Sequence, residues 1–423
     1  MNNNEHMEFI DRITVYCLAA LVFVLPIAHM RALRAVLMLV PALLWVYRMI
    51  FRKEKLFIKN QLMLPWFVFI IFSGLSLFTA IDLRYSVREL LGTIVNFSLF
   101  CLFLNNIKTM KQVNVIILSL LLGSLVQAIY GAIHFFYGHM SLLDFYSAEH
   151  ALEVDHKYYS TYLITVLPFI MYKITTSRGK ARPALIGLMA LNLFMVVASQ
   201  QRGAWVAAGV EIAIFLWYVN RKLLFPLLGV IVVALTLLPS TVLYHGKKGI
   251  DLDAQFGKGR EENSITPRIE IWKFSLHEIV SHPFAAIGIG RRSFVKRYRQ
   301  FQNSDTWHAH NVFLDMALEL GIQGLLAFLC MMFVLARTFL EGFRKASVEA
   351  HYWFLASFVF LIGFFVRNMF DDLYIDDLVQ MFWAISGISF AVFLRMENIP
   401  YGRLLFKQKQ AAGRECLAVK SGL

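Results

Sequence analysis

Two histidines stand close together just before an apolar segment: His308 and His310, with Asn311 next. Histidine is the one side chain whose ordinary pKa lets it gain or lose a proton near neutral pH. A neutral imidazole could take a proton from a hydroxyl nucleophile, which is the task of a general base. His310 is therefore our candidate catalytic residue. The alternative is a histidine that only caps the following helix or lies at a membrane interface.

Carboxylates follow His310 at helical spacing. Asn311, Asp315 and Glu319 repeat every four residues, so they share one face of a helix and form a polar stripe that runs into an apolar segment. Carboxylates in such segments face the protein interior and a partner. All three are predicted to support the site, and Glu319, the deeper carboxylate, to orient or pair with His310 or an arginine. A structural salt bridge is the alternative.

The alternation of His308 and His310 could also hold a metal ion. No third ligand stands near them at metal spacing in the sequence. The chain also lacks a Gly-rich phosphate loop and a Gly-Xaa-Ser-Xaa-Gly nucleophile turn. We therefore expect no metal and no cofactor.

Four arginines could form an anion site, because a guanidinium fork binds phosphate oxygens bidentately and stays charged. Arg202 stands between two apolar segments with almost no loop, so its charge must lie near the headgroup plane. Arg268 falls in a polar segment, and Arg291 and Arg292 begin a basic cluster. Together they predict binding of a diphosphate. Contact with lipid phosphate, pairing of Arg202 with Asp371, or a solvated surface are the alternatives.

Apolar segments must hold these residues at a membrane. Hydrophobic residues make up 58% of the chain and charged residues 16%, and the mean hydropathy of +0.59 excludes a soluble protein. A hydrocarbon core of about 30 Å needs roughly 20 apolar residues per helix. Such windows lie at 13–30, 35–51, 61–80, 89–105, 113–136, 159–176, 183–200, 203–219, 222–243, 311–336, 351–368 and 378–395. The sequence predicts an all-α polytopic membrane protein with about 12 transmembrane helices.

Lys and Arg in short loops mark the cytoplasmic side. Alternate connections are basic, among them 52–59, 173–182 and 337–345. With an even number of spans, both termini are predicted to be cytoplasmic and the long segment 244–309 to lie on the other side of the membrane. The predicted divisions are 1–243 with helices 1–9, the large outer loop 244–309, 310–395 with helices 10–12, and a cytoplasmic tail at 396–423.

The outer loop has internal structure of its own. Thr266 and Pro267 are typical of a helix start, apolar residues follow at helical spacing, and Pro283 marks the end. Gly288 and Gly290 then predict a turn before a second short helix. The loop holds 11 Lys and Arg against 7 Asp and Glu, a net charge of +4, which suits a polyanionic partner. Membrane lipids explain the cytoplasmic basic residues, and no module for nucleic acid is present.

These motifs together resemble the O-antigen ligase and polymerase superfamily of multispanning glycosyltransferases. His310 and Asn311, nine further residues, and then Gly321 to Gly324 resemble its ligase motif, and Ser199 to Ala204 is similar to its Arg-Gly element. Arg268 to Trp272, followed by His282, Pro283, Gly288 and Gly290, looks like its large-loop pattern. The resemblance covers roughly residues 150 to 390. Leu325 and Leu326 stand where some ligases carry threonines, which leaves the polymerases open.

The resemblance implies a GT-C-like fold and a metal-independent, inverting transfer of a glycan from undecaprenyl diphosphate to lipid A-core, on the periplasmic side of the bacterial inner membrane. By position, Arg202 and Arg268 would hold the diphosphate, Arg291 or Arg292 would assist, and His310 would activate the acceptor hydroxyl.

Three other functions stay open at this point. The first is an O-antigen or exopolysaccharide polymerase, and the second is a protein-directed oligosaccharyltransferase. The third, from a different class, is a transporter of polysaccharide or lipid-linked glycan. A transporter would place its charges around a midplane cavity, whereas the basic residues here gather toward the outer face.

Overall fold

The computed structural model describes residues 3–27, 30–52, 58–138, 156–199, 201–226, 266–298 and 308–397, and these residues form helices and no strand. The helices are α1 (Asn3–Val24), α2 (Arg31–Arg52), α3 (Met63–Leu75), η1 (Ser76–Thr79), α4 (Leu83–Asn106), α5 (Met110–Gly138), α7 (His156–Thr176), α8 (Ala181–Ala198), α9 (Arg202–Asn220), η2 (Arg221–Leu223), α13 (Thr266–Ser281), α14 (Arg292–Arg297), α15 (Val312–Lys345), α16 (Val348–Asn368) and α17 (Asp376–Glu397). The predicted all-α class is confirmed for the part of the chain described.

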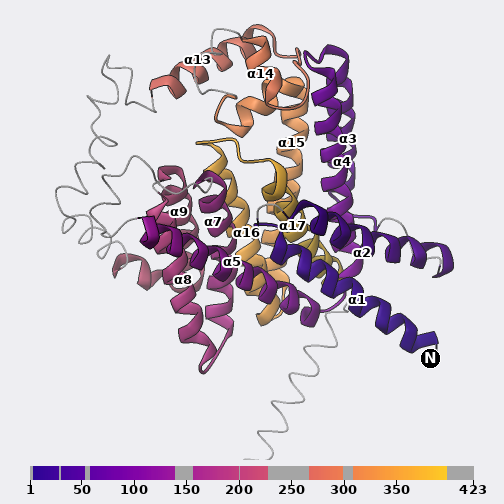
Figure 1. Cartoon of the computed structure of the whole chain (residues 1–423), viewed down its shortest axis with the longest axis vertical. Coiled ribbons are helices and arrows are strands. Elements are labelled where there is room, and N and C mark those ends of the chain that lie inside the picture. Colours follow the sequence, from indigo (N-terminus) through magenta and orange to yellow (C-terminus); the bar gives the residue numbers. More distant parts are fainter. Residues whose placement is uncertain are drawn as a thin grey trace, which may run out of the picture.

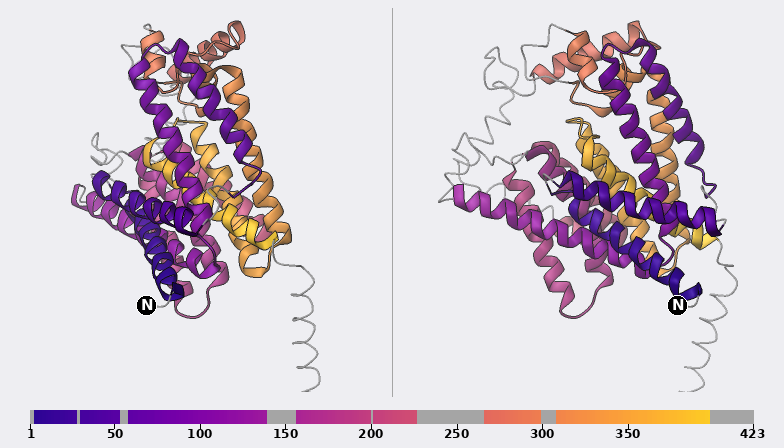
Figure 2. Two further views of the ribbon diagram at one scale, coloured as in Figure 1. Left: turned by 90° about the vertical axis from the view of Figure 1, so that its right-hand side faces the viewer. Right: turned by 45° about the vertical axis from the view of Figure 1, so that its right-hand side comes forward.

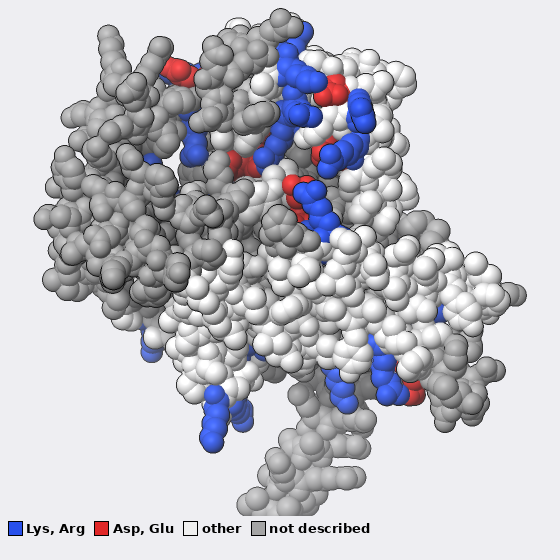
Figure 3. Space-filling view, viewed as in Figure 1, with Lys and Arg blue, Asp and Glu red and all other residues white. Residues whose placement is uncertain are grey.

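Eight of these helices are long and apolar enough to cross a membrane: α2, α4, α5, α8, α9, α15, α16 and α17. Charged side chains gather above and below a largely uncharged middle band in Figure 3. The chain is therefore a multi-pass membrane protein. Helices α1 and α7 and the shorter apolar stretch Met63–Thr79 also fall on predicted windows. The window at 222–243 extends beyond the described residues, so the count of twelve stays a prediction.

Helices α16 and α17 each pack against several of the other membrane helices. Helix α17 runs along α4, α16 lies against α7, α9 and α15, and α1 packs on α2 and α5 (Figure 2). Close approach between α4 and α17 needs a small residue, because a Cβ at Gly387 would lie 2.6 Å from the Phe100 carbonyl oxygen. Small residues serve membrane packing in this way because lipid is as apolar as the side chains, so the helices are held by van der Waals contact.

Helix α15 is broken near its start, at Gly321. This residue has φ 75° and ψ 175°, a conformation that is essentially open only to glycine. The helical hydrogen bond from the Ile322 N–H to the Leu318 carbonyl is therefore replaced. The Ile322 N–H donates to the Pro283 carbonyl at 2.8 Å, and the Leu318 carbonyl accepts from the Ile287 N–H at 3.2 Å. The sequence predicted a single membrane span at 311–336. The structure corrects this: the helix is interrupted at Gly321, where its backbone binds the segment 283–290 in place of one helical hydrogen bond.

The segment 283–290 is thus fixed between α15 and the turn that joins α3 to α4. On the α15 side, the Gly290 N–H donates to Glu319 Oε2 at 2.7 Å. On the other side, the Ile287 carbonyl accepts from the Ile81 N–H at 3.2 Å and the Ile289 N–H donates to Ser76 Oγ at 3.1 Å. The segment carries the two short helices that flank it.

Helices α13 and α14 lie across the upper end of the molecule in Figure 1, above the start of α15. A small apolar cluster joins them to that start; it contains Ile271, Ile287, Phe294, Tyr298, Ala309 and Leu318. The predicted helix from Thr266 to the residues before Pro283 and the predicted short helix after Gly290 are both confirmed as α13 and α14. The rest of the predicted loop, 244–265 and 299–307, lies outside the described residues.

Replacing Gly321 by alanine should loosen the segment 283–290, because the side chain forces a conformation that costs roughly 1–3 kcal/mol. We expect a lower melting temperature in detergent and faster hydrogen exchange at the amides of Ile287 and Ile322. The control is Gly209→Ala on α9, where a Cβ would meet nothing within 4 Å. Equal exchange in the two variants would show that the break at Gly321 does not hold the segment.

Candidate active site

The strained turn before α15 presents the two histidines. His310 has φ 51°, in the left-handed region that a residue with a Cβ occupies only where its surroundings hold it there. Asn311 follows as the N-cap: its side-chain oxygen accepts the N–H groups of Phe313 and Leu314 at 3.0 and 3.3 Å. Its side-chain amide donates to the Met369 carbonyl at 3.2 Å. Asn311 therefore supports the site by starting the helix and joining it to the α16–α17 connection.

That connection supplies the partner of the candidate base. His310 Nδ1 lies 3.1 Å from Asp371 Oδ1, and the Asp371 side chain is only 2% exposed. The sequence suggested that Glu319 could orient His310, but Asp371 makes this contact. Glu319 accepts the Gly290 N–H instead and holds the segment 283–290. Asp371 is 61 residues from His310, so no local spacing could reveal the pair, although the run of polar residues after the eleventh predicted span was a signal.

His308 and Asp315 lie beneath His310. Asp315 Oδ1 accepts the Ala309 N–H at 2.8 Å, and its Oδ2 lies 3.3 Å from His308 Nδ1. His308 Nδ1 also lies 3.0 Å from the His310 backbone nitrogen, and His308 Nε2 lies 3.5 Å from Asp371 Oδ1. Asp315 and His308 are both buried, so the predicted support from Asp315 takes the form of holding this turn.

Burial keeps His310 neutral at physiological pH. Removal from water lowers the pKa of its imidazole below the ordinary 6.5, and this outweighs the hydrogen bond to Asp371, which favours the charged form. The charges of His308 and Arg268 act in the same direction as burial. A neutral imidazole beside a carboxylate is the state in which a histidine accepts a proton.

Arg268 is carried to the site by α13. One turn after it, the indole N–H of Trp272 donates to the Ala309 carbonyl at 2.9 Å, which fixes α13 next to His310. Arg268 interacts electrostatically with both His310 and Arg202. It makes no hydrogen bond or ion pair with any residue in the described ranges. Two guanidinium groups are thus brought near each other and near His310, an arrangement that favours an anion.

Arg202 begins α9, and the next residue explains how α9 approaches the site. A Cβ at Gly203 would lie 3.0 Å from Phe370 Cβ and 3.1 Å from an Nη1 of Arg367. Phe370 directly precedes Asp371, so the start of α9 packs against the same connection that orients His310. The Arg-Gly element of the sequence therefore has a structural reason: arginine for its charge, and glycine for close packing.

Arg291 and Arg292 take different positions. The Arg291 Nε donates to Asp372 Oδ2 at 2.9 Å. Burial alone would lower the pKa of Arg291, but the carboxylates of Asp372, Asp315 and Asp371 raise it, so the residue stays charged. Its Nη2 is buried without a partner among the described residues. The Arg292 guanidinium instead lies 5.7 Å from the centre of the Tyr85 ring on α4, and no contact with His310 is present within the described ranges.

In the folded protein, a third side chain that could bind a metal ion, Asp371, lies beside the two histidines. Ligand atoms of His308, His310 and Asp371 lie within 4.8 Å of one another, as do those of His308, Asp315 and Asp372. The sequence showed no third ligand at metal spacing, and the reason is the distance along the chain to Asp371. In the first group, one oxygen of Asp371 lies 3.1 Å from His310 Nδ1 and 3.5 Å from His308 Nε2. The absence of a metal ion from this site stays a prediction.

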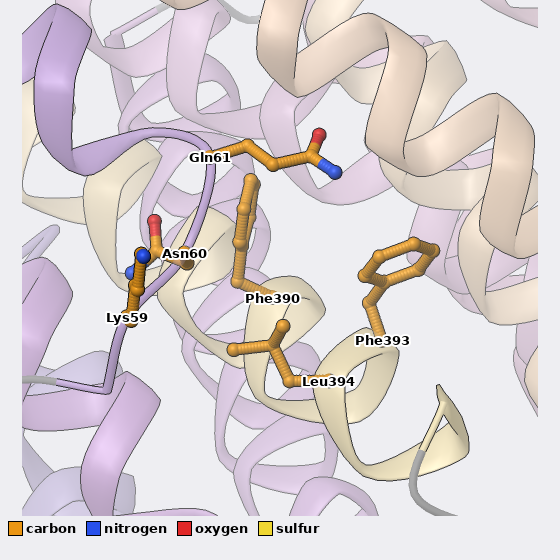
Figure 4. A pocket seen from close by; sticks show the side chains of 6 residues that line it. All are labelled: Lys59, Asn60, Gln61, Phe390, Phe393 and Leu394. Carbon is orange, nitrogen blue, oxygen red and sulfur yellow. The ribbon is translucent and has the colours of Figure 1, made fainter.

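One cavity of the described residues lies away from this chemistry. It has a volume of about 270 Å³ and is lined by Lys59, Asn60, Gln61, Phe390, Phe393 and Leu394 (Figure 4). Its α17 residues belong to the last turns of that helix, whereas Asp371 lies just before its first residue, Asp376. No carboxylate or histidine lines the cavity, so it is not the candidate site.

The central part of the chain is similar to a known protein family. Residues 187–329 match the family model described as O-Antigen ligase, a stretch that contains Arg202, Arg268, Arg291, Arg292 and the whole turn from His308 to Glu319. The expected resemblance to the O-antigen ligase superfamily is thereby confirmed. Asp371 lies outside the matched residues.

Several proteins that are named as polysaccharide ligases are similar to this chain at low sequence identity. A Rickettsia conorii protein named "Putative polysaccharide ligase" is 23% identical over 244 residues, 55% of this chain and 56% of the relative. A Rickettsia felis protein of the same name gives the same identity and coverage. In a third such protein, from Rickettsia typhi, the identity is 24% over 308 residues, 70% of this chain and 72% of the relative. The match thus spans about half the length of the first two relatives.

Replacing Trp272 by phenylalanine should release α13 from the histidine turn, because the ring is kept and only the hydrogen bond to Ala309 is lost, which contributes about 0.5–1.5 kcal/mol. We expect faster cleavage within 266–298 on limited proteolysis of the protein in lipid nanodiscs, with the cut sites identified by mass spectrometry. Trp217→Phe is the matched control, since Trp217 is 61% exposed on a membrane helix. Identical cleavage of the two variants would contradict the role of Trp272 as an anchor.

Proposed function

We propose that this chain, a membrane protein whose central region matches the O-antigen ligase family, transfers a glycan from undecaprenyl diphosphate to lipid A-core. The observation that carries the proposal is the hydrogen bond between His310 and Asp371 beside Arg268. It combines a neutral histidine held by a carboxylate with an arginine that has no anionic partner among the described residues.

His310 acts as the general base in this reaction. Because its Nδ1 faces Asp371, the other ring nitrogen, Nε2, is the atom that meets the acceptor hydroxyl. The acceptor oxygen attacks the anomeric carbon, the bond from that carbon to the diphosphate oxygen breaks, and the hydroxyl proton passes to Nε2. The lipid diphosphate leaves with the electron pair. Attack opposite the leaving group inverts the anomeric centre.

Arg202 and Arg268 bind the diphosphate. Negative charge on the leaving diphosphate grows in the transition state, so preorganised guanidinium groups stabilise that state more than the ground state. Arg291 is already paired with Asp372, and its Nη2 is the group that remains to assist. Arg292, over the Tyr85 ring, contributes only to the positive charge near the site. No step needs a metal ion or a cofactor.

The upper end of the molecule faces the periplasm in this proposal, and the membrane is the bacterial inner membrane. Basic residues of the short loops lie at the opposite ends of the helices, as Arg344 and Lys345 do in the last turn of α15, which agrees with the bias of cytoplasmic loops. The N-terminus of α1 also lies at the lower end in Figure 1. The lipid donor then reaches the arginines from the bilayer, and α13 and α14 cover the site.

Transfer of the glycan to a growing chain on the lipid carrier, as in a polymerase, is the second candidate. It uses the same arginines and the same histidine, so the acceptor alone separates the two reactions. The ligase is preferred because the matched family model is described as O-Antigen ligase.

Replacing His310 by glutamine should lower the rate constant of transfer by about 10²-fold or more, the lower bound for loss of general-base catalysis. The assay uses the purified protein in nanodiscs, undecaprenyl diphosphate-linked glycan and lipid A-core, with a chelator present in one arm. His277→Gln is the control, because His277 is an exposed residue of α13. The proposal fails if His310→Gln transfers glycan at the normal rate, or if the chelator abolishes transfer by the wild type.

Replacing Arg268 by lysine should lower kcat about tenfold or more, since an ammonium group keeps the charge but cannot form the bidentate hydrogen bonds of a guanidinium, each worth about 1.5–3 kcal/mol to a charged group. The measurement is kcat and KM for the lipid donor in the same assay. Arg297→Lys, an exposed residue of α14, should behave as wild type. Unchanged kinetics of Arg268→Lys would remove Arg268 from the diphosphate site.

A further inference from the structure

A closed circuit of contacts joins His308, Asp371 and His310. The His310 backbone N–H points to His308 Nδ1 at 3.0 Å, His308 Nε2 lies 3.5 Å from Asp371 Oδ1, and that same oxygen lies 3.1 Å from His310 Nδ1. The two imidazole rings are tilted by 45° with centres 4.3 Å apart. The circuit begins and ends at the candidate base.

The first contact settles which nitrogen of His308 carries the proton. A backbone N–H can only donate, so His308 Nδ1 must accept, and the proton of a neutral His308 is on Nε2. The competing contact of Nδ1 with Asp315 Oδ2 is longer, at 3.3 Å, and it cannot change this assignment because the amide hydrogen is fixed by the backbone.

The proton on His308 Nε2 then faces Asp371 Oδ1. A carboxylate oxygen only accepts hydrogen bonds and can accept more than one, so Asp371 Oδ1 accepts from the His310 Nδ1–H and tolerates the more distant His308 Nε2–H. His310 therefore carries its proton on Nδ1, and its Nε2 lone pair is left for substrate. If His308 had the opposite tautomer, its Nδ1 could not accept the His310 N–H, and the backbone position that brings His310 Nδ1 to Asp371 would lose this support.

We propose that His308 is a positioning residue: it accepts the backbone N–H of His310 and thereby keeps the His310 ring against Asp371, in the tautomer protonated at Nδ1. The proposal rests on the proposed function only for its catalytic meaning; the tautomer itself is a property of the folded protein. Acceptance of the His310 N–H by His308 also explains what stabilises the left-handed φ of 51° at His310.

The circuit predicts a tautomer that can be observed directly. Solid-state NMR of the protein with ¹⁵N-labelled histidine in lipid bilayers distinguishes the two ring nitrogens, and the His310 signals are identified by their loss in His310→Gln. Wild type should show His310 protonated at Nδ1 alone, near pH 7.5, and His308 protonated at Nε2. Protonation of His310 at Nε2 in wild type would overturn the proposal whatever the activity of the protein.

Two substitutions separate positioning from packing. His308→Phe keeps a flat ring and removes the acceptor of the His310 N–H, whereas His308→Gln keeps a side-chain oxygen that can accept it. We expect His308→Phe to show a mixture of His310 tautomers and a kcat at least about tenfold lower with KM nearly unchanged, and His308→Gln to recover part of the loss. His277→Phe, at an exposed position, is the control. A purely structural role would make glutamine no better than phenylalanine, and that result would also overturn the proposal.

The pH profile gives an independent readout. The charged or titratable groups that face His310 are His308, Asp371, Arg268 and Asp315. In wild type, the rate should fall only below the ordinary histidine pKa of 6.5, because burial lowers the pKa of His310. Loss of the His308 acceptor loosens the contact of His310 with Asp371, which favours the charged imidazole, so the acidic fall should move to lower pH in His308→Phe. An unmoved profile together with a single wild-type tautomer in this variant would contradict the inference.

Failure of this inference and failure of the proposed function are distinguishable. If no glycan is transferred to lipid A-core or to a growing chain by wild type, the proposed function fails, while the NMR spectrum still decides the tautomer. If transfer is normal and requires His310, but the spectrum shows the other tautomer, only the role of His308 is lost.

Discussion

A single hydrogen bond that α15 does not make determines how the upper end of the molecule is assembled. The Ile322 N–H and the Leu318 carbonyl would pair in an unbroken helix, but the conformation of Gly321 separates them. The Ile322 N–H donates to the Pro283 carbonyl instead, and the Leu318 carbonyl accepts from the Ile287 N–H. Buried backbone groups are almost always paired, so the break is stable only while the segment 283–290 is bound. The segment 283–290 and helix α15 therefore stabilise each other, and this contact determines where α13 and α14 lie.

The same constraint brings the candidate site residues together. Residues before the break, from Val312 to Leu320, form a short helical stretch whose buried carboxylates, Asp315 and Glu319, hold the histidine turn and the 283–290 segment. The neighbouring Arg291 supplies the positive charge that such buried carboxylates need, through its ion pair with Asp372. The acidic residues are thus occupied with structure, which leaves Arg202 and Arg268 as the arginines best placed for an anionic substrate.

The histidines, carboxylates and arginines of the candidate site lie together at one end of the molecule, and this fits transfer chemistry at a membrane surface better than transport. A transporter is expected to bind its substrate near the bilayer midplane, often at interrupted helices. Here the interruption in α15 opens toward a loop segment, and the titratable residues around it lie near the ends of α9, α15 and α16. The proposed reaction needs this location, because its donor is anchored in the bilayer while its acceptor hydroxyl is polar.

The sequence by itself determined what depends on local composition and spacing. Local patterns predicted the apolar windows, the helix before Pro283 and the polar stripe of Asn311, Asp315 and Glu319. They also predicted the motif that joins His310 to Gly321 by its spacing. All of these depend on helix periodicity and glycine conformation, which act over a few residues. Only the tertiary structure decided that Asp371 rather than Glu319 meets His310, that His308 lies against both of them, and that Arg291 pairs with Asp372 while Arg268 has no ion pair among the described residues. Those facts depend on segments some 60 or more residues apart meeting in space, and the packing that brings them together is set by the broken helix and not by any local pattern.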